Sequence, residues 1–128
     1  MQIVAKAREY FALHLQESID MTAVPWALGI SHDCLNVSFE QVRGMTPAQA
    51  LLEQRLNRLF AALTEQPRQG LRRAIRTCGL DSTAAVVALF EQTFGIDMPL
   101  FLLTCRRAAD DRLFRRDHPE PEALVLPT

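Results

Sequence analysis

The feature that most constrains the fold is an internal repeat of glycine and phenylalanine positions. The segment GISHDCLNVSFEQVRGMTP, residues 29–47, can be laid over GLDSTAAVVALFEQTFGIDMP, residues 79–99. Both begin with a glycine, contain Phe-Glu-Gln, and continue to a second glycine, Gly44 in one and Gly95 in the other. Each copy reads as the end of one helix, a short turn that contains glycine, and a second helix. The repeat therefore predicts two helix-turn-helix units in one chain.

Apolar residues recur at helical spacing along most of the sequence, for example at Val4, Ala7, Phe11 and Leu15. No stretch alternates apolar and polar residues for long enough to indicate a strand, so we expect an all-α fold. Capping and helix-breaking residues divide the chain into about seven helices. We expect them from Gln2 to Glu17, from Asp20 or Thr22 to Gly29, from Ser31 to Gly44, from Thr46-Pro47 to Thr64, from the break at 67–70 to Cys78, from Asp81 or Ser82 to Gly95, and from Pro99 to Arg116.

These helices predict four parts. Residues 1–47 form a first helix-turn-helix subdomain, 48–66 a linker helix, 67–116 a second, degenerate helix-turn-helix subdomain, and 117–128 a tail. The tail combines prolines and acids with a final Leu-Val-Leu, which favours a flexible segment. A short apolar docking motif is the alternative.

Composition limits the class of protein. Hydrophobic residues make up 48% of the 128 residues and charged residues 23%, a balance typical of globular proteins. Cys34, Cys78 and Cys105 are far apart and show no metal-ligand spacing, which indicates a reducing compartment and favours buried structural cysteines over a thiol sensor. The start has no signal-peptide pattern, and the longest apolar stretch, 98–103, is too short to span a membrane. We expect a cytoplasmic protein.

Enzyme signatures are missing from the sequence. It contains no glycine-rich phosphate loop, no metal-ligand cluster and no recognisable pairing of a Ser or Cys nucleophile with His and Asp. We therefore expect neither catalysis nor a cofactor.

Charge is distributed unevenly. Six arginines and a single acid, Glu65, lie between residues 55 and 76. Arginines in such a cluster can pair with phosphates and supply the salt-sensitive part of DNA affinity. A solvated surface is the alternative.

The doubled frame resembles the DNA-binding domain of the AraC/XylS family of bacterial transcription regulators, over about residues 3–109. In that family each half reads as an alanine-rich helix, Gly-apolar-Ser, a recognition helix ending in Phe-x-x-x-x-Gly, then Thr-Pro and another helix. The matching residues are Gly29-Ile30-Ser31, Leu35, Phe39, Gly44, Thr46-Pro47 and Arg55-Leu56 in the first half, and Cys78-Gly79-Leu80, Phe90, Phe94 and Gly95 in the second.

The resemblance implies a function. In the family each recognition helix enters a major groove, and the linker helix holds the two about one helical turn of DNA apart. Because this chain begins almost at its first predicted helix, it looks like stand-alone members such as MarA and SoxS. The family likeness implies an activator that binds duplex DNA, contacts RNA polymerase or another regulator, and is a monomer as an isolated domain.

Departures from the family pattern concentrate in the second recognition helix. Family members commonly carry arginine two residues before the phenylalanine, a position held here by Val37 and Ala88. A bidentate side-chain contact is worth about 1–3 kcal/mol of base discrimination, and the outward positions of the second helix offer none. We therefore expect the first recognition helix to carry most base reading.

Candidate DNA contacts lie on the first recognition helix, in the basic region and at the start of the second recognition helix. They are Ser31, His32, Asn36, Gln41, Arg43, Arg55, Arg72, Arg73, Arg76, Ser82 and Thr83. Asn36 can bond an adenine edge twice, and His32 can contact a base or phosphate. Asp33 and Glu40 on the same helix would face phosphates unfavourably.

A second hypothesis retains the predicted fold but gives it a protein partner in place of DNA. The chain would then be a protein-interaction module, a coregulator or anti-activator that no longer reads bases. It would bind another regulator through the apolar outer positions Ala84, Val87 and Ala88.

Overall fold

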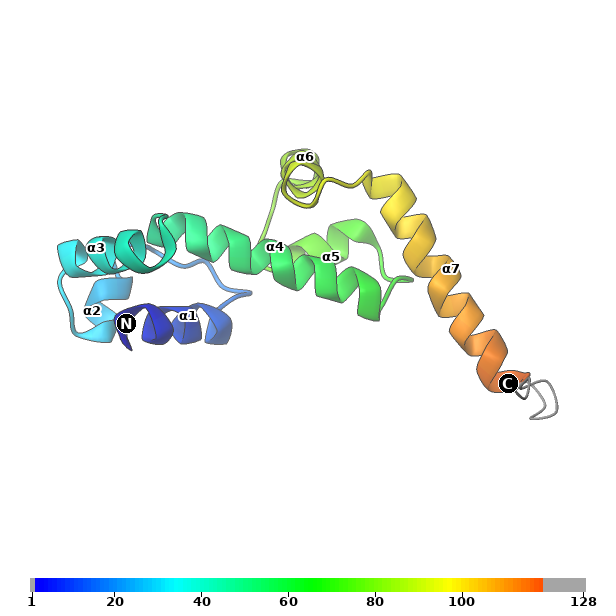
Figure 1. Ribbon diagram of the computed structural model, residues 1–128, viewed down its shortest axis with the longest axis horizontal. Coiled ribbons are helices and arrows are strands. Elements are labelled where there is room, and N and C mark those ends of the chain that lie inside the picture. The colour runs from blue at the N-terminus through cyan, green and yellow to red at the C-terminus, as the bar shows by residue number, and fades with distance from the viewer. Residues whose placement is uncertain (1, 119–128) are drawn as a thin grey trace, which may run out of the picture.

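The computed structural model describes residues 2–118 of the chain (Figure 1). All regular secondary structure in this range is helical, which confirms the all-α prediction. The helices are α1 (Gln2–Leu13), α2 (Val24–Leu28), α3 (His32–Arg43), α4 (Pro47–Glu65), α5 (Leu71–Thr77), α6 (Thr83–Phe94) and α7 (Met98–Asp117). The predicted tail lies outside the described residues except for 117 and 118, of which Asp117 ends α7.

Two predicted helix boundaries near the N-terminus were wrong. Helix α1 ends at Leu13 and not at Glu17, because the chain turns at residues 14–16. Helix α2 begins at Val24, later than expected. The Asp20 carboxylate accepts hydrogen bonds from the backbone N–H and hydroxyl of Thr22, at 3.0 and 2.7 Å, and so holds residues 20–23 in a turn.

Helix α7 is anchored at its start by two carboxylates. Asp97 accepts a hydrogen bond from the backbone N–H of Leu100 at 3.0 Å, and Glu91 of α6 accepts one from the N–H of Met98 at 2.7 Å. Both satisfy backbone donors that have no partner inside the helix. These contacts fix the direction in which α7 leaves α6.

The core consists of two clusters that α4 joins. Ala50 and Leu51 of α4 pack in the first cluster with α1, α2 and α3. Leu59 and Leu63 of α4 pack in the second with α5, α6 and α7. The long helix is therefore part of both cores and sets the distance between the two halves.

Figure 1 shows how the halves lie along α4. Helices α1, α2 and α3 gather at its N-terminal part, and α5, α6 and α7 at its C-terminal part. Helix α7 then runs away from the body, so that its second half projects from the molecule. Within residues 2–118 no single helix has the length and apolarity of a membrane span, although α6 and α7, which meet at a 77° bend, would pass that test as a pair by composition alone.

Candidate nucleic-acid interface

The first recognition helix, α3, has firmly defined ends. The Ser31 hydroxyl accepts a hydrogen bond from the backbone N–H of Cys34 at 3.1 Å, and Gly44 closes the helix in the left-handed conformation, with φ of 66°. Leu35 and Phe39 are buried and hold one side of the helix on the core. The opposite side is left for solvent or a partner.

The outer side of α3 carries mixed chemistry. His32, Asn36 and Gln41 are exposed, as their predicted role requires. Asp33 and Glu40 are exposed on the same helix, and they repel phosphates. Ser31 is committed to the helix cap, so its hydroxyl oxygen contributes to folding.

Two candidate arginines are engaged within the chain. Arg43 pairs with Glu53 of α4, with 2.5 Å between Nη2 and Oε1. Arg55 donates from Nε to the Leu15 carbonyl at 3.3 Å and from Nη2 to the Glu17 carbonyl at 2.7 Å. Burial lowers the pKa of Arg55, and the negative charge of Asp81 partly opposes this shift. Both guanidinium groups are therefore occupied by contacts within the chain.

Helix α5 presents three exposed arginines on one side. Ala74 and Ile75 are buried, whereas Arg72, Arg73 and Arg76 are exposed on its outer side. Among residues 2–118, none of these three arginines has a carboxylate within ion-pair distance. In a helix-turn-helix the helix before the turn crosses the DNA backbone, so these guanidinium groups are suited to phosphates.

The second recognition helix, α6, presents an almost smooth surface. Ala84, Ala85 and Ala88 are exposed, and Gln92 near its C-terminal end is the one long polar side chain that joins them. Val87 was predicted to lie outside, but it is half-buried and packs against the second core. The predicted cap is also weaker than expected, because Ser82 occupies the N-cap position and its side chain caps no backbone N–H.

The two recognition helices point in different directions. In Figure 1, α3 lies across the view and α6 is seen along its axis. Helices α3 and α6 would therefore meet a straight duplex at different angles.

Comparison with solved structures identifies this arrangement. An AraC-type regulator from Chromobacterium violaceum superimposes with a TM-score of 0.74 at 21% identity, covering 81% of this chain and 92% of that chain. The chain has the fold of an AraC-type DNA-binding domain. A probable AraC family regulator from Rhodopseudomonas palustris gives 0.73 at 19% identity, covering 82% and 98%. A DNA-binding transcriptional dual regulator from Escherichia coli gives 0.73 at 13% identity, covering 82% and 93%.

No protein-family model matches this sequence, and no curated protein does. The solved structures nevertheless confirm the AraC-type resemblance at the level of the fold, which rests on residues that form turns and pack in the cores. Sequence reasoning missed two contributions to this fold. Glu91 caps α7, and Arg55 ties α4 to the loop after α1. The backbone partner of Glu91 lies seven residues on, in the next helix, and those of Arg55 lie 40 and 38 residues away, so no local side-chain pattern reveals them.

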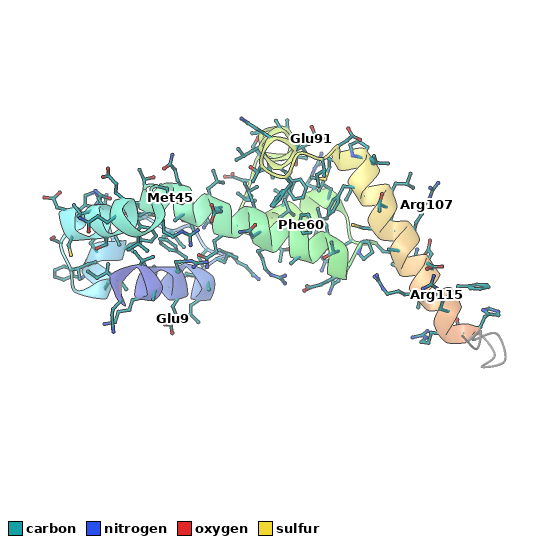
Figure 2. The ribbon with its side chains drawn as sticks, viewed as in Figure 1. Glu9, Met45, Phe60, Glu91, Arg107 and Arg115 are labelled. Carbon is teal, nitrogen blue, oxygen red and sulfur yellow. The ribbon has the colours of Figure 1, made fainter. Side chains whose placement is uncertain are left out.

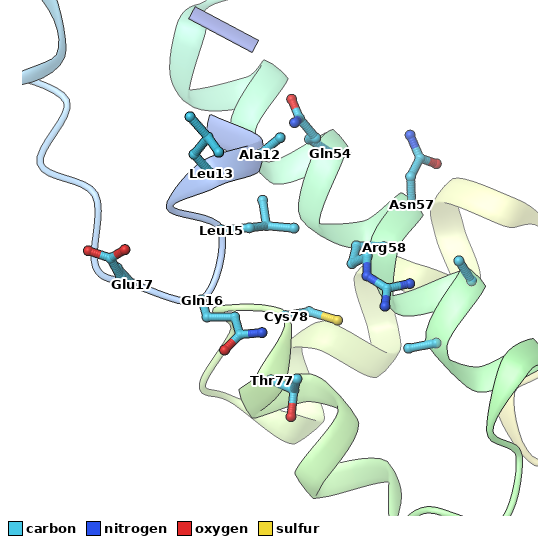
Figure 3. Close-up of a pocket in the computed structure, with 12 residues that line it drawn as sticks. Ala12, Leu13, Leu15, Gln16, Glu17, Gln54, Asn57, Arg58, Thr77 and Cys78 are labelled. Carbon is cyan, nitrogen blue, oxygen red and sulfur yellow. The ribbon is translucent and has the colours of Figure 1, made fainter. Parts of the chain in front are cut away.

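An open groove of about 730 Å³ lies between parts of the two halves of this AraC-type fold (Figure 3). Leu15 and Gln16 line it from the loop after α1, Asn57 and Arg58 from α4, and Cys78 from the end of α5. Burial raises the pKa of the Cys78 thiol, and the nearby charge of Arg58 partly opposes this. Among residues 2–118 no group of three His, Cys, Asp or Glu side chains is placed to hold a metal ion.

Proposed function

We propose that the protein is an AraC-type transcription regulator that binds duplex DNA through α3 and the exposed arginines of α5. The observation that carries this proposal is the exposed face of α5, where Arg72, Arg73 and Arg76 have no acidic partner among residues 2–118. The position of α5 before the second turn of an AraC-type fold supports contact between that face and the DNA backbone.

Base reading belongs to the N-terminal part of α3. Asn36 can donate to and accept from one adenine edge, and His32 lies one turn earlier on the helix. Gln41 lies further along α3 and can reach a base only if the axis of α3 runs along the major groove. Asp33 and Glu40 restrict the approach, because each brings a carboxylate towards the phosphates. We expect modest sequence preference and affinity that depends strongly on salt.

Helix α6 takes part without reading bases. Thr83 and Ser82 lie at its N-terminus, where backbone N–H groups can face a phosphate. Its alanines can touch thymine methyl groups but discriminate poorly. The second half therefore contacts the DNA backbone and helps to position the protein on the duplex.

Salt-titrated DNA binding tests this proposal. Random-sequence selection on the intact chain identifies a preferred site, and binding to it is then measured over a range of salt concentrations. We expect the double variant Arg72→Ala/Arg73→Ala to reduce the salt slope by about 0.9 per lost phosphate contact. Asn36→Ala should reduce preference for the site and keep the slope.

Arg112→Ala is a matched control, because Arg112 is an exposed arginine on α7 and has no ion pair among residues 2–118. It should leave the salt slope and the preference for the site unchanged. A wild-type protein without sequence preference and without a salt slope would refute the proposal.

A second candidate, the protein-interaction module, is favoured by the alanine surface of α6. Ala84, Ala85 and Ala88 form a shallow apolar patch free of long side chains, which suits another protein better than a phosphate backbone. RNA polymerase or another regulator would be its partner.

Expression of variants in a bacterial host separates the two candidates. If the module is the right description, Ala88→Glu abolishes the transcriptional response measured by RNA sequencing, and Arg72→Ala/Arg73→Ala leaves it intact. Ala5→Glu on α1 is the control for a charge placed on another exposed alanine. The opposite pattern supports DNA binding.

A further inference from the structure

Helix α7 has an exposed stripe directly opposite its buried side. The buried and half-buried residues are Met98, Phe101, Leu102, Cys105 and Ala109. The opposite side carries Leu100, Leu103, Arg107, Asp111 and Phe114, which follow one another at three- or four-residue steps and so share one face of the helix. We call these five residues the α7 stripe.

Most of this stripe is left uncovered by residues 2–118, although the His118 ring stacks on Phe114 with 4.3 Å between the ring centroids. Leu100 and Phe114 are each 61% exposed and Leu103 is 42% exposed. Figure 2 shows Arg107 pointing away from the body of the molecule, and it has no ion pair among residues 2–118. The bonds that tie this part of α7 to the body leave from other positions, by the ion pair between Arg68 and Asp110 and by the bond from Arg106 Nε to the Pro67 carbonyl at 3.4 Å.

The order of chemistry along the stripe is self-complementary. From one end it reads apolar, basic, acidic, apolar, at Leu103, Arg107, Asp111 and Phe114. A second α7 laid antiparallel, with a twofold axis near position 109, brings Arg107 of each copy to Asp111 of the other. The same register brings Leu103 of each copy to Phe114 of the other. Such pairing of one patch with itself is the arrangement that twofold dimers use.

We propose that α7 pairs antiparallel with α7 of a second copy of this chain. The leucines and phenylalanine exclude water at the two ends of the contact, and the charges set direction and register. Asp111 keeps its existing partner Arg115, 3.2 Å away one turn further on, because a carboxylate can accept from two guanidinium groups. The contact involves one face of one helix, about 21 Å long from Leu100 to Phe114, so the dimer is weak and forms at high protein concentration or on DNA.

This pairing goes beyond DNA binding by one domain. It would place two AraC-type units on one duplex, with their second halves adjacent. A weakly reading monomer would then gain affinity from its neighbour. Of the other large exposed apolar side chains, Trp26 has no charged residue three or four positions away. Leu13 shares its face of α1 with Glu9 and Lys6 but with no second large exposed apolar residue beyond them, so neither side chain specifies a partner.

Sedimentation analysis over a concentration series tests the proposal through charge reversal. We expect Arg107→Glu alone to be monomeric, because the introduced carboxylate of each copy faces Asp111 of the other. Asp111→Arg alone should be monomeric for the corresponding reason. An equimolar mixture of the two variants should dimerise, since every contact then joins opposite charges, and the double variant should dimerise by itself.

Arg112→Glu is the control, because Arg112 is exposed beside the buried side of the helix and lies outside the stripe. It should associate as the wild type does. Circular dichroism confirms that each variant folds, and the mixture excludes misfolding as the cause of dissociation. A wild-type chain that stays monomeric at several hundred micromolar in low salt, or a mixture no more associated than its components, overturns the proposal. A dimer that Arg107→Glu leaves intact does so too.

Discussion

The two helix-turn-helix halves share one frame and differ most at the N-termini of their recognition helices. In the first half the Ser31 hydroxyl accepts a bond from Cys34 N–H, and His32 and Asn36 stand exposed beside it. In the second half Ser82 occupies the same position without that bond, and Ala84, Ala85 and Ala88 follow. Both halves keep their turn glycine and central phenylalanine. The residues that form the fold are thus present in both halves, whereas side chains that could read bases are present on the first recognition helix only.

The largest effect should come from the central phenylalanines, both fully buried. Phe90 has three aromatic neighbours, Phe60, Phe94 and Phe101, with centroids at 6.1, 4.7 and 5.5 Å, whereas Phe39 has one recorded among residues 2–118, Phe11 at 6.2 Å. We expect Phe90→Ala to lower the free energy of unfolding by about 3–5 kcal/mol, and Phe39→Ala to lie at the lower end of that range. Urea unfolding followed by circular dichroism measures both, and a larger loss for Phe39→Ala would contradict the ranking.

The next largest effect should come from replacing the two turn glycines, and its size should differ between them. Gly29 and Gly79 both have positive φ, 71° and 81°. A Cβ at Gly29 meets open space, so Gly29→Ala should cost about 1–2 kcal/mol for the left-handed conformation alone. A Cβ at Gly79 would overlap the Leu15 carbonyl oxygen and lie 2.8 Å from Arg55 Nε, so Gly79→Ala must cost more. Equal losses in thermal or urea unfolding would show that the two halves are not in contact there.

The two capping positions make a smaller, paired test. Ser31→Ala removes a hydrogen bond to a backbone N–H and should lower the free energy of unfolding by about 1 kcal/mol. Ser82→Ala removes no such bond and should change it by less than about 0.5 kcal/mol. If both variants lose the same amount, the second helix is capped as firmly as the first.

The smallest effect concerns thiol reactivity and leaves stability unchanged. Cys34 on α3 is half-buried, whereas Cys78 in the second half is 1% exposed and burial raises its pKa. The thiolate is the reactive form, so a maleimide should modify Cys34 at least about ten times faster than Cys78. Mass spectrometry of peptides from the alkylated native protein gives the two rates, and urea should equalise them.

Local and repeated signals in the sequence predicted most of the fold. The glycine and phenylalanine repeat defines two units, and apolar spacing places the helices of both cores. Helix ends set by distant or unusual contacts were harder, as at α2, where the Asp20 turn replaces a helical turn. The candidate site was less predictable. The exposure of His32, Asn36 and the α5 arginines follows from periodicity, but the engagement of Arg43 and Arg55 depends on tertiary neighbours. Val87 was misplaced because it packs against the second cluster, so the side of α6 that meets the core is wider than Val86 and Phe90 alone indicate.

The bonds from Arg55 to the Leu15 and Glu17 carbonyls have a mechanical consequence. They brace the loop after α1 against the linker helix at the point where Gly79 of the second half comes close. Rotation of the first half about the axis of α4 must break them, so the chain resists twisting there. A duplex aligned by α3 would then also set the orientation of α6. A helix that reads no bases can still be held in a defined position relative to the duplex.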